Sequence, residues 1–270
     1  METKKNTIGE IAALLQSDAF LQGPEEERQK LLEHLSADGR SGVQRLLEKY
    51  RRSEKKLAEE RARIEKMKEY ELKYADITYI AGIDEVGRGP LAGPVVTCAV
   101  ILPKDCRILY VNDSKQLTAE KRETLCNEIL KQAISVGIGV VPPQRIDEIN
   151  ILQATYEAMR NSIEKLEPAP ELLLNDAVTI PGVTIPQVPI IKGDAKCFAI
   201  AAASIVAKVT RDRMMVEYDR MYPGYQFAKN KGYGSEEHIN ALKKLGPSPI
   251  HRRSFLGKLE SEQEDTAVSD

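Results

Sequence analysis

The sequence predicts an α/β protein whose centre is a mixed β-sheet with helices on its faces. From Tyr79 onward, short runs of apolar and β-branched residues, which are typical of strands, alternate with longer stretches of helical periodicity. The first two runs are joined by a short loop rich in Gly and Pro, as in a hairpin, whereas the later runs are separated by helices. Antiparallel and parallel pairing are therefore both expected in one sheet.

Length and composition limit the possible classes of protein. The chain has 270 residues, of which 42% are hydrophobic, so it can bury a substantial core. The net charge of −2 provides no general attraction for nucleic acid, but residues 205–258 carry 11 basic and only 5 acidic side chains. This local excess of positive charge indicates a segment suited to contact phosphates.

Two further features argue against membrane and zinc proteins. The longest apolar run, at 95–102, is far shorter than the roughly twenty residues of a membrane-spanning helix. No apolar segment follows the first lysines, so neither a membrane anchor nor secretion is expected, and the predicted location is the cytoplasm. The four cysteines include no C-x-x-C pair and the chain has three histidines, which argues against zinc and for reduced thiols.

Residues 1–75 are predicted to form a helical N-terminal extension, because they are rich in Glu, Lys, Arg and Leu and their apolar residues recur at helical spacing. Breaks are expected at residues 23–24 and 38–39, so two shorter helices should precede a long, highly charged one. Two interpretations of the narrow apolar stripe stay open: it packs on its own domain or a partner, or the segment binds nucleic acid directly. The stripe consists of Val43, Leu46, Leu47, Tyr50, Leu57 and Ile64.

The elements of the next domain, residues 76–258, are predicted in order from the same periodicities. Strands are expected at residues 79–83, 95–102, 134–141, 171–174 and 188–191. Helices are expected at residues 117–131, 145–166 and 196–220, followed by a Gly/Pro/Tyr-rich loop region with a short helix at 236–245. Residues 259–270 contain acids but no base and are expected to be disordered.

The segment at 81–90 combines an apolar strand with two adjacent acids, Asp84 and Glu85, and a turn formed by Gly87, Arg88 and Gly89. Packing cannot explain acids at that position. Because strand residues alternate between faces, the two acids converge only if the strand bends at Glu85, or if Glu85 contributes its carbonyl or its longer side chain. The glycines permit close backbone approach, so exposed N–H groups can meet a phosphate or hydroxyl. If this segment has no role in function, the alternative is an acidic surface turn in which Arg88 forms a local ion pair.

Two further acids lie at element boundaries. Asp176 follows the apolar run at 172–174, at the carboxyl end of a strand, where open α/β sheets place their sites. Its structural alternative is an Asx turn with Asn175. Asp194 precedes the helix that contains Phe198, and its alternative, an N-cap, is compatible with a carboxylate that also faces a metal.

Together the four acids favour a site for a hard divalent cation, Mg²⁺ or Mn²⁺, since the sequence has no catalytic Ser-His or Cys-His arrangement and no P-loop. Carboxylates that hold two such ions about 4 Å apart serve phosphoryl transfer well. Tyr222, Tyr225 and Tyr233 lie among Lys and Gly residues, where their rings can contact sugars or bases. Ordinary roles in turns and core stay open for Tyr222 and Tyr225.

Five separated motifs, in order over residues 79–255, strongly resemble the ribonuclease HII family. They are G-I-D-E-V-G-R-G-P-L-A-G-P-V at 82–95, N-D-S-K-Q-L at 112–117, K-G-D-A-K at 192–196, A-A-A-S-I-V-A-K-V-T-R-D at 201–212 and K-G-Y-G-S-E-E-H at 231–238. The resemblance implies an RNase H-like fold and a metal-dependent endoribonuclease. Such an enzyme hydrolyses the RNA strand of RNA–DNA hybrids and incises 5′ of single ribonucleotides in duplex DNA, leaving 3′-hydroxyl and 5′-phosphate ends.

The resemblance also implies roles for individual residues. The backbone of the turn at 87–89 is expected to grip the ribose 2′-hydroxyl at the cut, and Tyr233 to hydrogen-bond that hydroxyl and stack on the neighbouring deoxyribose. This fits the physical requirement, because the 2′-hydroxyl is what distinguishes RNA from DNA at a given position. The family's metal-binding acids, which hold Mg²⁺ or Mn²⁺, correspond to Asp84, Glu85, Asp176 and Asp194. Phosphate contacts are expected from Ser114, Lys115, Ser204 and Lys208.

One position departs from the family pattern, since Ala177 follows Asp176 where glycine is more usual. The motifs say nothing about the helical extension. Two rival functions remain: a glycosidase that uses a carboxylate pair without metal, and a non-catalytic adaptor that binds nucleic acid through its basic C-terminal part. Loss of activity in EDTA separates the nuclease from the first, and strand cleavage in Mg²⁺ or Mn²⁺ from the second. A monomer is expected, although the seven-residue spacing of the stripe leaves dimerisation open.

Overall fold

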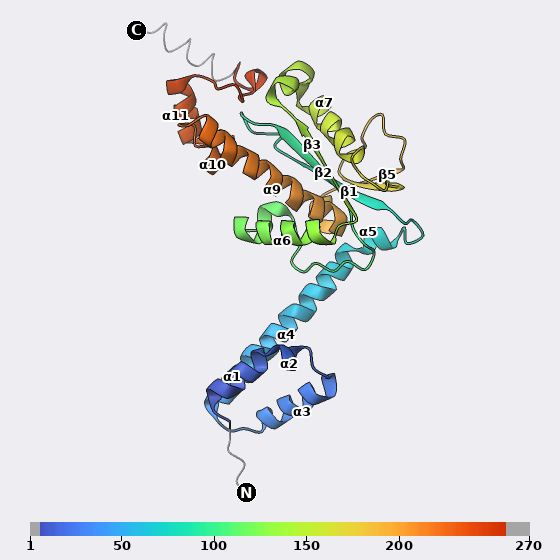
Figure 1. Cartoon of the computed structure of the whole chain (residues 1–270), viewed down its shortest axis with the longest axis vertical. Coiled ribbons are helices and arrows are strands. Elements are labelled where there is room, and N and C mark those ends of the chain that lie inside the picture. The colour runs from blue at the N-terminus through green and yellow to red at the C-terminus, as the bar shows by residue number, and fades with distance from the viewer. Residues whose placement is uncertain (1–5, 258–270) are drawn as a thin grey trace. The chain divides into compact units, whose positions relative to one another are not determined.

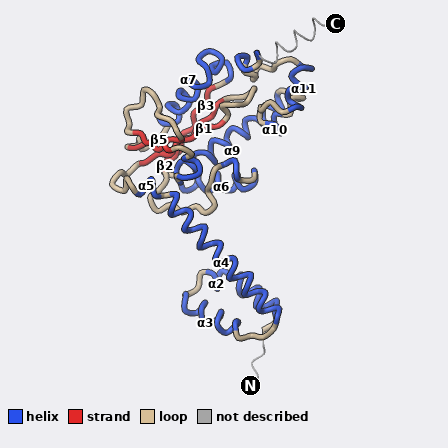
Figure 2. Tube along the Cα trace, turned by 180° about the vertical axis from the view of Figure 1, so that it is seen from behind, coloured by secondary structure: helices blue, strands red, loops and turns tan. Residues whose placement is uncertain are grey.

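The computed structural model describes residues 6–257 and divides the chain into two compact units (Figures 1 and 2). The border falls between Arg63 and Ile64, inside the long helix α4 (Ser41–Met67). Each unit has a hydrophobic core of its own. The acidic tail predicted at 259–270 lies outside the described residues.

The first unit is a cluster of α1 (Ile8–Gln16), α2 (Asp18–Leu21), α3 (Glu25–Ser36) and the first part of α4. A capping box begins α1, since the Thr7 hydroxyl accepts a hydrogen bond from the Glu10 amide while the Glu10 carboxylate accepts one from the Thr7 amide. The predicted breaks at 23–24 and 38–39 separate α2 from α3 and α3 from α4, although three helices rather than two precede α4. Part of the predicted stripe packs on its own unit, whose core contains Ile11, Leu15, Phe20, Leu35, Val43 and Leu47.

The second unit is built on one five-stranded sheet with the order β3-β2-β1-β4-β5. Strand β2 pairs antiparallel with β1 and β3, whereas β4 pairs parallel with β1 and β5. The predicted mixed sheet is therefore confirmed, and all of its predicted strands are present. They are β1 (Ile80–Val86), β2 (Val95–Ile101), β3 (Ser135–Val141), β4 (Leu172–Asp176) and β5 (Gln187–Ile190).

Helices cover both faces of this sheet (Figure 1). On one face, α6 (Ala119–Gln132) and α9 (Phe198–Met221) pack against a core to which Cys98 of β2 contributes. On the opposite face, α7 (Pro143–Ile163) packs against a core that contains Ala99, the next residue of the same strand. Every residue of β2 is therefore buried, which explains why its sequence is continuously apolar instead of alternating.

Short helices complete the second unit. Those that follow α9 form the predicted C-terminal region of helix and loop. All four cysteines of the chain are free and buried. Within residues 6–257, no helix has the length and apolar character needed to cross a membrane. The short helices are α5 (Glu69–Leu72), η1 (Ser114–Gln116), α8 (Gly193–Lys196), α10 (Phe227–Asn230), α11 (Glu236–Leu245) and η2 (Arg253–Phe255).

Candidate active site

The carboxyl ends of β1 and β4 bring two of the predicted acids together. In the parallel ladder between these strands, Ile83 is paired with Asn175. The next residue along each strand is an acid, Asp84 on β1 and Asp176 on β4. Because both strands run in the same direction, the two carboxylates lie at one edge of the sheet, which we call the acidic edge.

Asp84 is buried at this edge, with 6% of its surface exposed. Its Oδ1 accepts a hydrogen bond from the Glu85 amide at 2.8 Å, and the Ser204 hydroxyl of α9 also bonds to the carboxylate. The Ser204 hydroxyl is 2.9 Å from that of Ser114, and both serines are buried. Burial raises the pKa of Asp84 well above its ordinary value, Glu85 and Asp176 raise it further, and Ser204 opposes the rise. The two serines, expected to contact phosphate, thus form a buried hydroxyl pair that supports Asp84.

Glu85 leaves β1 on the face opposite to Asp84. The ladder with β2 stays regular through Val86, so the bend considered as a way to bring the two acids together is not present in β1. Glu85 Oε1 forms the local ion pair with Arg88, at 3.3 Å from Nη1, whereas its buried Oε2 has no hydrogen-bond partner among the described residues. Burial raises the pKa of Glu85, Arg88 opposes this rise and Asp176 adds to it.

Asp176 is bound to the start of α8 instead of to its own turn. Its Oδ1 accepts a hydrogen bond at 2.7 Å from the amide of Gly193, 17 residues away, so a local Asx turn does not describe its role. The next residue, Ala177, has a φ of 54°, in the left-handed region that favours glycine. The unusual alanine therefore adopts a conformation that costs about 1–2 kcal/mol for a residue with a Cβ.

Asp194 joins the acidic edge from α8. Burial raises the pKa of Asp194 and the charge of Asp176 raises it further, which makes these two carboxylates electrostatic neighbours. The N-cap alternative is wrong, because Asp194 lies inside α8 and the N-cap of α9 is Cys197, which makes no side-chain capping bond. The first amides of a helix have no partner within the helix. At the start of α9, the Ala199 amide donates a hydrogen bond to Oε1 of Glu71 in α5 at 2.8 Å.

The donor set at the acidic edge suits a hard divalent cation. Carboxylate oxygens are the ligands that Mg²⁺ and Mn²⁺ prefer. Burial and mutual repulsion raise the pKa of Asp84 and Glu85, so a bound cation would relieve an unfavourable accumulation of negative charge. The unpartnered Oε2 of Glu85 is a free ligand atom. In residues 6–257 no three acids, histidines or cysteines form a ready-made metal cluster, so full coordination by the acids requires side-chain movement.

The turn at 87–89, which we call the glycine turn, lies against Tyr233. A Cβ placed on Gly89 would be 3.9 Å from Cε1 of the tyrosine ring, so the ring lies next to the turn on the side that the missing Cβ leaves open. Tyr233 is 45% exposed, which leaves its ring and hydroxyl accessible to a ligand. Tyr222 and Tyr225 belong to the core around the end of α9, in agreement with their ordinary structural alternative.

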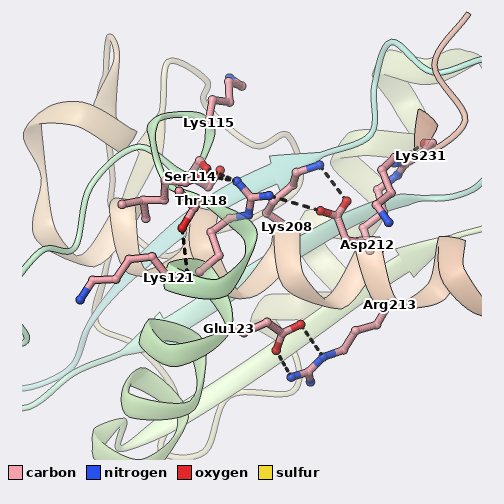
Figure 3. A network of polar contacts seen from close by, with 12 residues as sticks. Ser114, Lys115, Thr118, Lys121, Glu123, Lys208, Asp212, Arg213 and Lys231 are labelled. Atoms are coloured by element: carbon pink, nitrogen blue, oxygen red, sulfur yellow. Dashed lines mark hydrogen bonds and ion pairs between the residues drawn. The ribbon is translucent and has the colours of Figure 1, made fainter. Parts of the chain in front are cut away.

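Basic side chains lie on α9 and on the segment before α6, in a polar network that includes Asp212 (Figure 3). Lys208 Nζ forms an ion pair with Asp212 Oδ1 at 2.7 Å, so this predicted phosphate ligand already has a carboxylate partner. Lys115 is exposed. Burial alone would lower the pKa of Lys115, but four carboxylates together raise it, namely Asp113, Asp194, Asp84 and Asp176. The charge of Lys115 therefore interacts with the carboxylates of the acidic edge.

Sequence comparisons give the same assignment over almost the whole chain. A family model described as Ribonuclease HII matches residues 81–258, and one described as Ribonuclease HII N-terminal domain matches residues 7–75. The chain belongs to the ribonuclease HII family. Ribonuclease HII of Lachnoclostridium phytofermentans is 70% identical over 224 residues, which cover 83% of this chain and 88% of that protein. Ribonuclease HII of Latilactobacillus sakei subsp. sakei is 50% identical over 254 residues, 94% of this chain and 97% of that protein.

Solved structures of ribonucleases have the same fold. Ribonuclease H2 from Pyrococcus horikoshii is 29% identical with a TM-score of 0.55, covering 66% of this chain and 93% of that chain. RNase HII from Archaeoglobus fulgidus, solved in complex with PCNA, is 27% identical with a TM-score of 0.53, covering 65% and 93%. The predicted RNase H-like fold is confirmed. The predicted enzyme class is confirmed as well, since the ribonuclease HII family consists of metal-dependent endoribonucleases.

Several residues that support the site were not identified from the sequence. Glu71 binds the start of α9 from a segment that reads as part of the extension. Arg211 and Arg252 bind the carbonyls of the glycine turn and of the loop that follows it. Arg252 lies in a basic stretch that resembles solvent-exposed sequence, so no local pattern marks it as buried. Only the three-dimensional contacts reveal these supports.

Proposed function

We propose that this protein hydrolyses the RNA strand of RNA–DNA hybrids and incises duplex DNA on the 5′ side of single embedded ribonucleotides, leaving 3′-hydroxyl and 5′-phosphate ends. The observation that carries the proposal is the succession of the acidic edge and the glycine turn along β1. Asp84 and Glu85 lie near the end of the strand beside Asp176, and residues 87–89 follow at once against Tyr233. A ribose held at the turn would place its phosphodiester beside the carboxylates.

The acidic edge is proposed to hold two divalent cations, Mg²⁺ or Mn²⁺. Such ions, when bound, lower the pKa of an attacking water and stabilise the departing oxygen. The protein's own contribution is to hold the carboxylates in place: Ser204 orients Asp84, and the Gly193 amide orients Asp176. Asp194 adds a further carboxylate from α8. The proposed ligands are Asp84, Glu85, Asp176 and Asp194.

The glycine turn is proposed to select ribose. The 2′-hydroxyl is the group that distinguishes an embedded ribonucleotide from its neighbours. Amides of the turn can donate to this hydroxyl, while the exposed Tyr233 can hydrogen-bond it and stack on the next sugar. The exposed Lys115, whose charge interacts with the carboxylates of the edge, is proposed to contact a phosphate near the acids. The cellular role that follows is removal of ribonucleotides from DNA during replication and repair.

A cleavage assay on three matched duplexes tests this function. One carries a single ribonucleotide, one is an RNA–DNA hybrid and one is all DNA, and each is incubated with Mg²⁺, Mn²⁺ or EDTA. We expect metal-dependent incision on the 5′ side of the ribonucleotide and within the hybrid, with the all-DNA duplex intact. Cleavage in EDTA, or duplex binding without cleavage in either metal, would contradict the proposal; the second result would favour an adaptor.

We further propose that residues 1–75 are a helical extension of a catalytic domain at 76–258, and that the protein acts as a cytoplasmic monomer without membrane association. The matches to separate family models at 7–75 and 81–258 support this division. The last turns of the extension also belong to the second unit, because Ile64 and Met67 lie in its core. Sedimentation equilibrium of the full chain tests the monomer, which a concentration-dependent rise in mass would exclude.

A further inference from the structure

Two buried arginines lie behind the glycine turn. Arg211 of α9 and Arg252, which directly precedes η2, are each 0% exposed. Arginine is almost never buried to this degree unless it is paired, yet within residues 6–257 no carboxylate lies at ion-pair distance from either guanidinium. Burial lowers the pKa of Arg211 to about 10 and that of Arg252 to about 9, so both stay charged at neutral pH. Backbone carbonyls must therefore stabilise two buried positive charges.

Arg252 binds the carbonyls of the glycine turn from inside the protein. Its Nη2 donates to the Gly87 carbonyl at 2.5 Å and to the Gly93 carbonyl at 2.8 Å. Its Nη1 donates to the Arg88 carbonyl at 2.9 Å, and its Nε to that of Gly93 at 2.9 Å. This arrangement depends on the planar fork of a guanidinium, which a lysine ammonium cannot reproduce.

Arg211 binds the continuation of the same loop from α9. Its Nη2 donates to the Ala92 carbonyl at 3.0 Å and its Nε to the Pro94 carbonyl at 2.9 Å. Its Nη1 donates to the carbonyl of Lys231 at 2.9 Å. Lys231 lies two residues before Tyr233, so this one side chain connects the loop after the glycine turn with the loop that carries the tyrosine.

Two glycines leave room for these guanidinium groups. Gly87 and Gly93 both have a φ of 89°, which strongly favours glycine. A Cβ on Gly87 would lie 2.2 Å from Arg211 Nε, and one on Gly93 would lie 3.2 Å from Arg211 Nη2 and 2.4 Å from Met215 Sδ. The sequence therefore provides both the backbone conformation and the space that the arginine contacts require.

The arginine contacts determine where the amides of the turn point. In a planar trans peptide, the C=O and the N–H point in opposite directions. Arg252 binds the carbonyls of Gly87 and Arg88, so the amides of Arg88 and Gly89, which belong to the same two peptide units, point away from it. Neither amide has an acceptor among residues 6–257. Hydrogen bonds along a chain polarise one another. A charged guanidinium bound to a carbonyl oxygen therefore also makes the N–H of the same peptide unit a stronger donor.

We propose that Arg252 and Arg211 are positioning residues for ribose selectivity: by binding carbonyls from inside the protein, they direct the amides of the glycine turn, together with Tyr233, toward the substrate 2′-hydroxyl. The inference rests on the proposed function, since it takes the turn as the ribose site. Neither arginine touches the substrate. A surface turn closed only by the Glu85–Arg88 ion pair would need no such buried support.

The test compares Arg252→Lys and Arg211→Lys with the wild type, with Arg253→Lys as the matched control because Arg253 is adjacent and exposed. For each protein, kcat and KM are measured on a duplex with one ribonucleotide. The inhibition constant of the same duplex in all-DNA form and the Mn²⁺ concentration for half-maximal activity are measured in parallel. We expect both variants to lose about 10- to 100-fold in kcat/KM. The inhibition constant and the Mn²⁺ dependence should stay at wild-type values, and the control should keep all three.

The contrary outcomes are distinguishable. Wild-type kcat/KM in both variants, or an equal loss of cleavage and of all-DNA binding, would overturn the proposal. Circular dichroism checks the fold of each variant; if Arg252→Lys does not fold, Arg211→Lys decides, and if neither folds the arginines are structural and the proposal fails. An inactive wild type would instead refute the proposed function, because the effect of each arginine is measured only as the ratio of variant to wild-type kcat/KM.

Discussion

The acidic edge and the glycine turn are neighbours on β1, but they are positioned by different means. At the edge, the proposed metal ligands are side chains, and strand register alone places Asp84 beside Asp176. At the turn, the proposed ribose contacts are backbone amides, whose direction we infer to depend on Arg252, 164 residues away from Arg88. A site made of side chains requires correct strand pairing, whereas a site made of backbone amides also requires partners for the opposite side of each peptide.

The two regions also differ in electrostatics. The edge gathers carboxylates whose burial and mutual repulsion raise the pKa of Asp84 and Glu85, so it favours a cation. The turn has two buried guanidinium groups behind it, Arg211 and Arg252, and so favours a hydrogen-bond acceptor in front. Substitutions at the edge should therefore change the chemical step, and substitutions at the turn should change the choice of sugar.

The largest effect is expected at the acidic edge, from Asp84→Asn. The amide keeps the shape of the side chain but removes the charge that would hold a cation, so cleavage should fall by at least about 10³-fold, or about 4 kcal/mol of transition-state stabilisation. Single-turnover cleavage with Mg²⁺ and with Mn²⁺ measures this. Asp105→Asn, at an exposed acid, is the control. Wild-type turnover in Asp84→Asn would refute the assignment of the edge.

The next largest effect is expected on the pH dependence of stability, because two histidines are buried next to the loop that carries Tyr233. His251 Nε2 is 3.0 Å from His238 Nε2, and His238 Nδ1 is 2.8 Å from the Tyr233 carbonyl. On its other side, His251 Nδ1 accepts a hydrogen bond from the Ser248 amide at 2.9 Å. Burial and the neighbouring His238 lower the pKa of His251 to about 4, and burial also lowers the pKa of His238.

Because the pKa of His251 in the folded protein lies below its value of about 6.5 in the unfolded chain, the unfolded chain binds more protons between these values. The free energy of unfolding should therefore fall as the pH is lowered from about 6.5 to 4, by up to about 3 kcal/mol from His251. Carboxyls whose pKa is raised, such as Asp84 and Glu85, contribute the opposite slope. Urea unfolding of the wild type is therefore compared with His251→Gln, and with the exposed His34→Gln as control. Equal pH slopes in all three proteins would contradict this prediction.

A smaller effect at the edge is expected from Ser204→Ala, which removes a hydrogen bond to Asp84 without removing its charge. We expect kcat to fall about tenfold, the worth of one hydrogen bond to a charged group, while all-DNA duplex inhibits as before. Ser162→Ala is the matched control, because this buried serine bonds to the Met159 carbonyl on α7. An unchanged kcat would mean that the serine pair does not orient Asp84.

The smallest effect is expected at the turn, from Tyr233→Phe. The ring against Gly89 is kept and only the hydroxyl is lost, so discrimination between a ribonucleotide and a deoxyribonucleotide should weaken by about 1 kcal/mol. Competition between the two duplexes measures this, with Tyr222→Phe in the core as control. Unchanged discrimination would assign selectivity to the amides alone.

The sheet could be predicted from the sequence, because its strands are apolar runs bounded by Gly, Pro or acids. The order β3-β2-β1-β4-β5 could not, since it depends on pairings between segments that are remote in sequence. Asp84 and Glu85 could be singled out as candidate ligands because acids at the end of an apolar strand have no packing role. The N-cap alternative for Asp194 was wrong because Asp194 lies inside a separate turn of helix, α8, and the N-cap of α9 is Cys197.

The support of the glycine turn shows the limit of sequence patterns most clearly. Arg252 belongs to a basic stretch that reads as exposed, yet its side chain is fully buried. Its environment is set by backbone carbonyls from a loop more than one hundred residues earlier, and backbone groups leave no trace in the residue pattern. For the same reason, Ser204 reads as part of a helix with small residues, and its bond to Asp84 appears only once α9 packs on β1.

The most direct test of whether the acidic edge and the glycine turn have separate roles measures cleavage and ribonucleotide-selective binding side by side in the wild type, Asp84→Asn and Arg252→Lys. Each protein is titrated with a single-ribonucleotide duplex and with its all-DNA counterpart in the same buffer and metal. We expect that Asp84→Asn does not cut but keeps the wild-type preference for the ribonucleotide, while Arg252→Lys loses that preference and keeps a metal-dependent residual cleavage. Loss of both properties together in each variant would contradict it, because the acidic edge and the glycine turn would then act as one inseparable site.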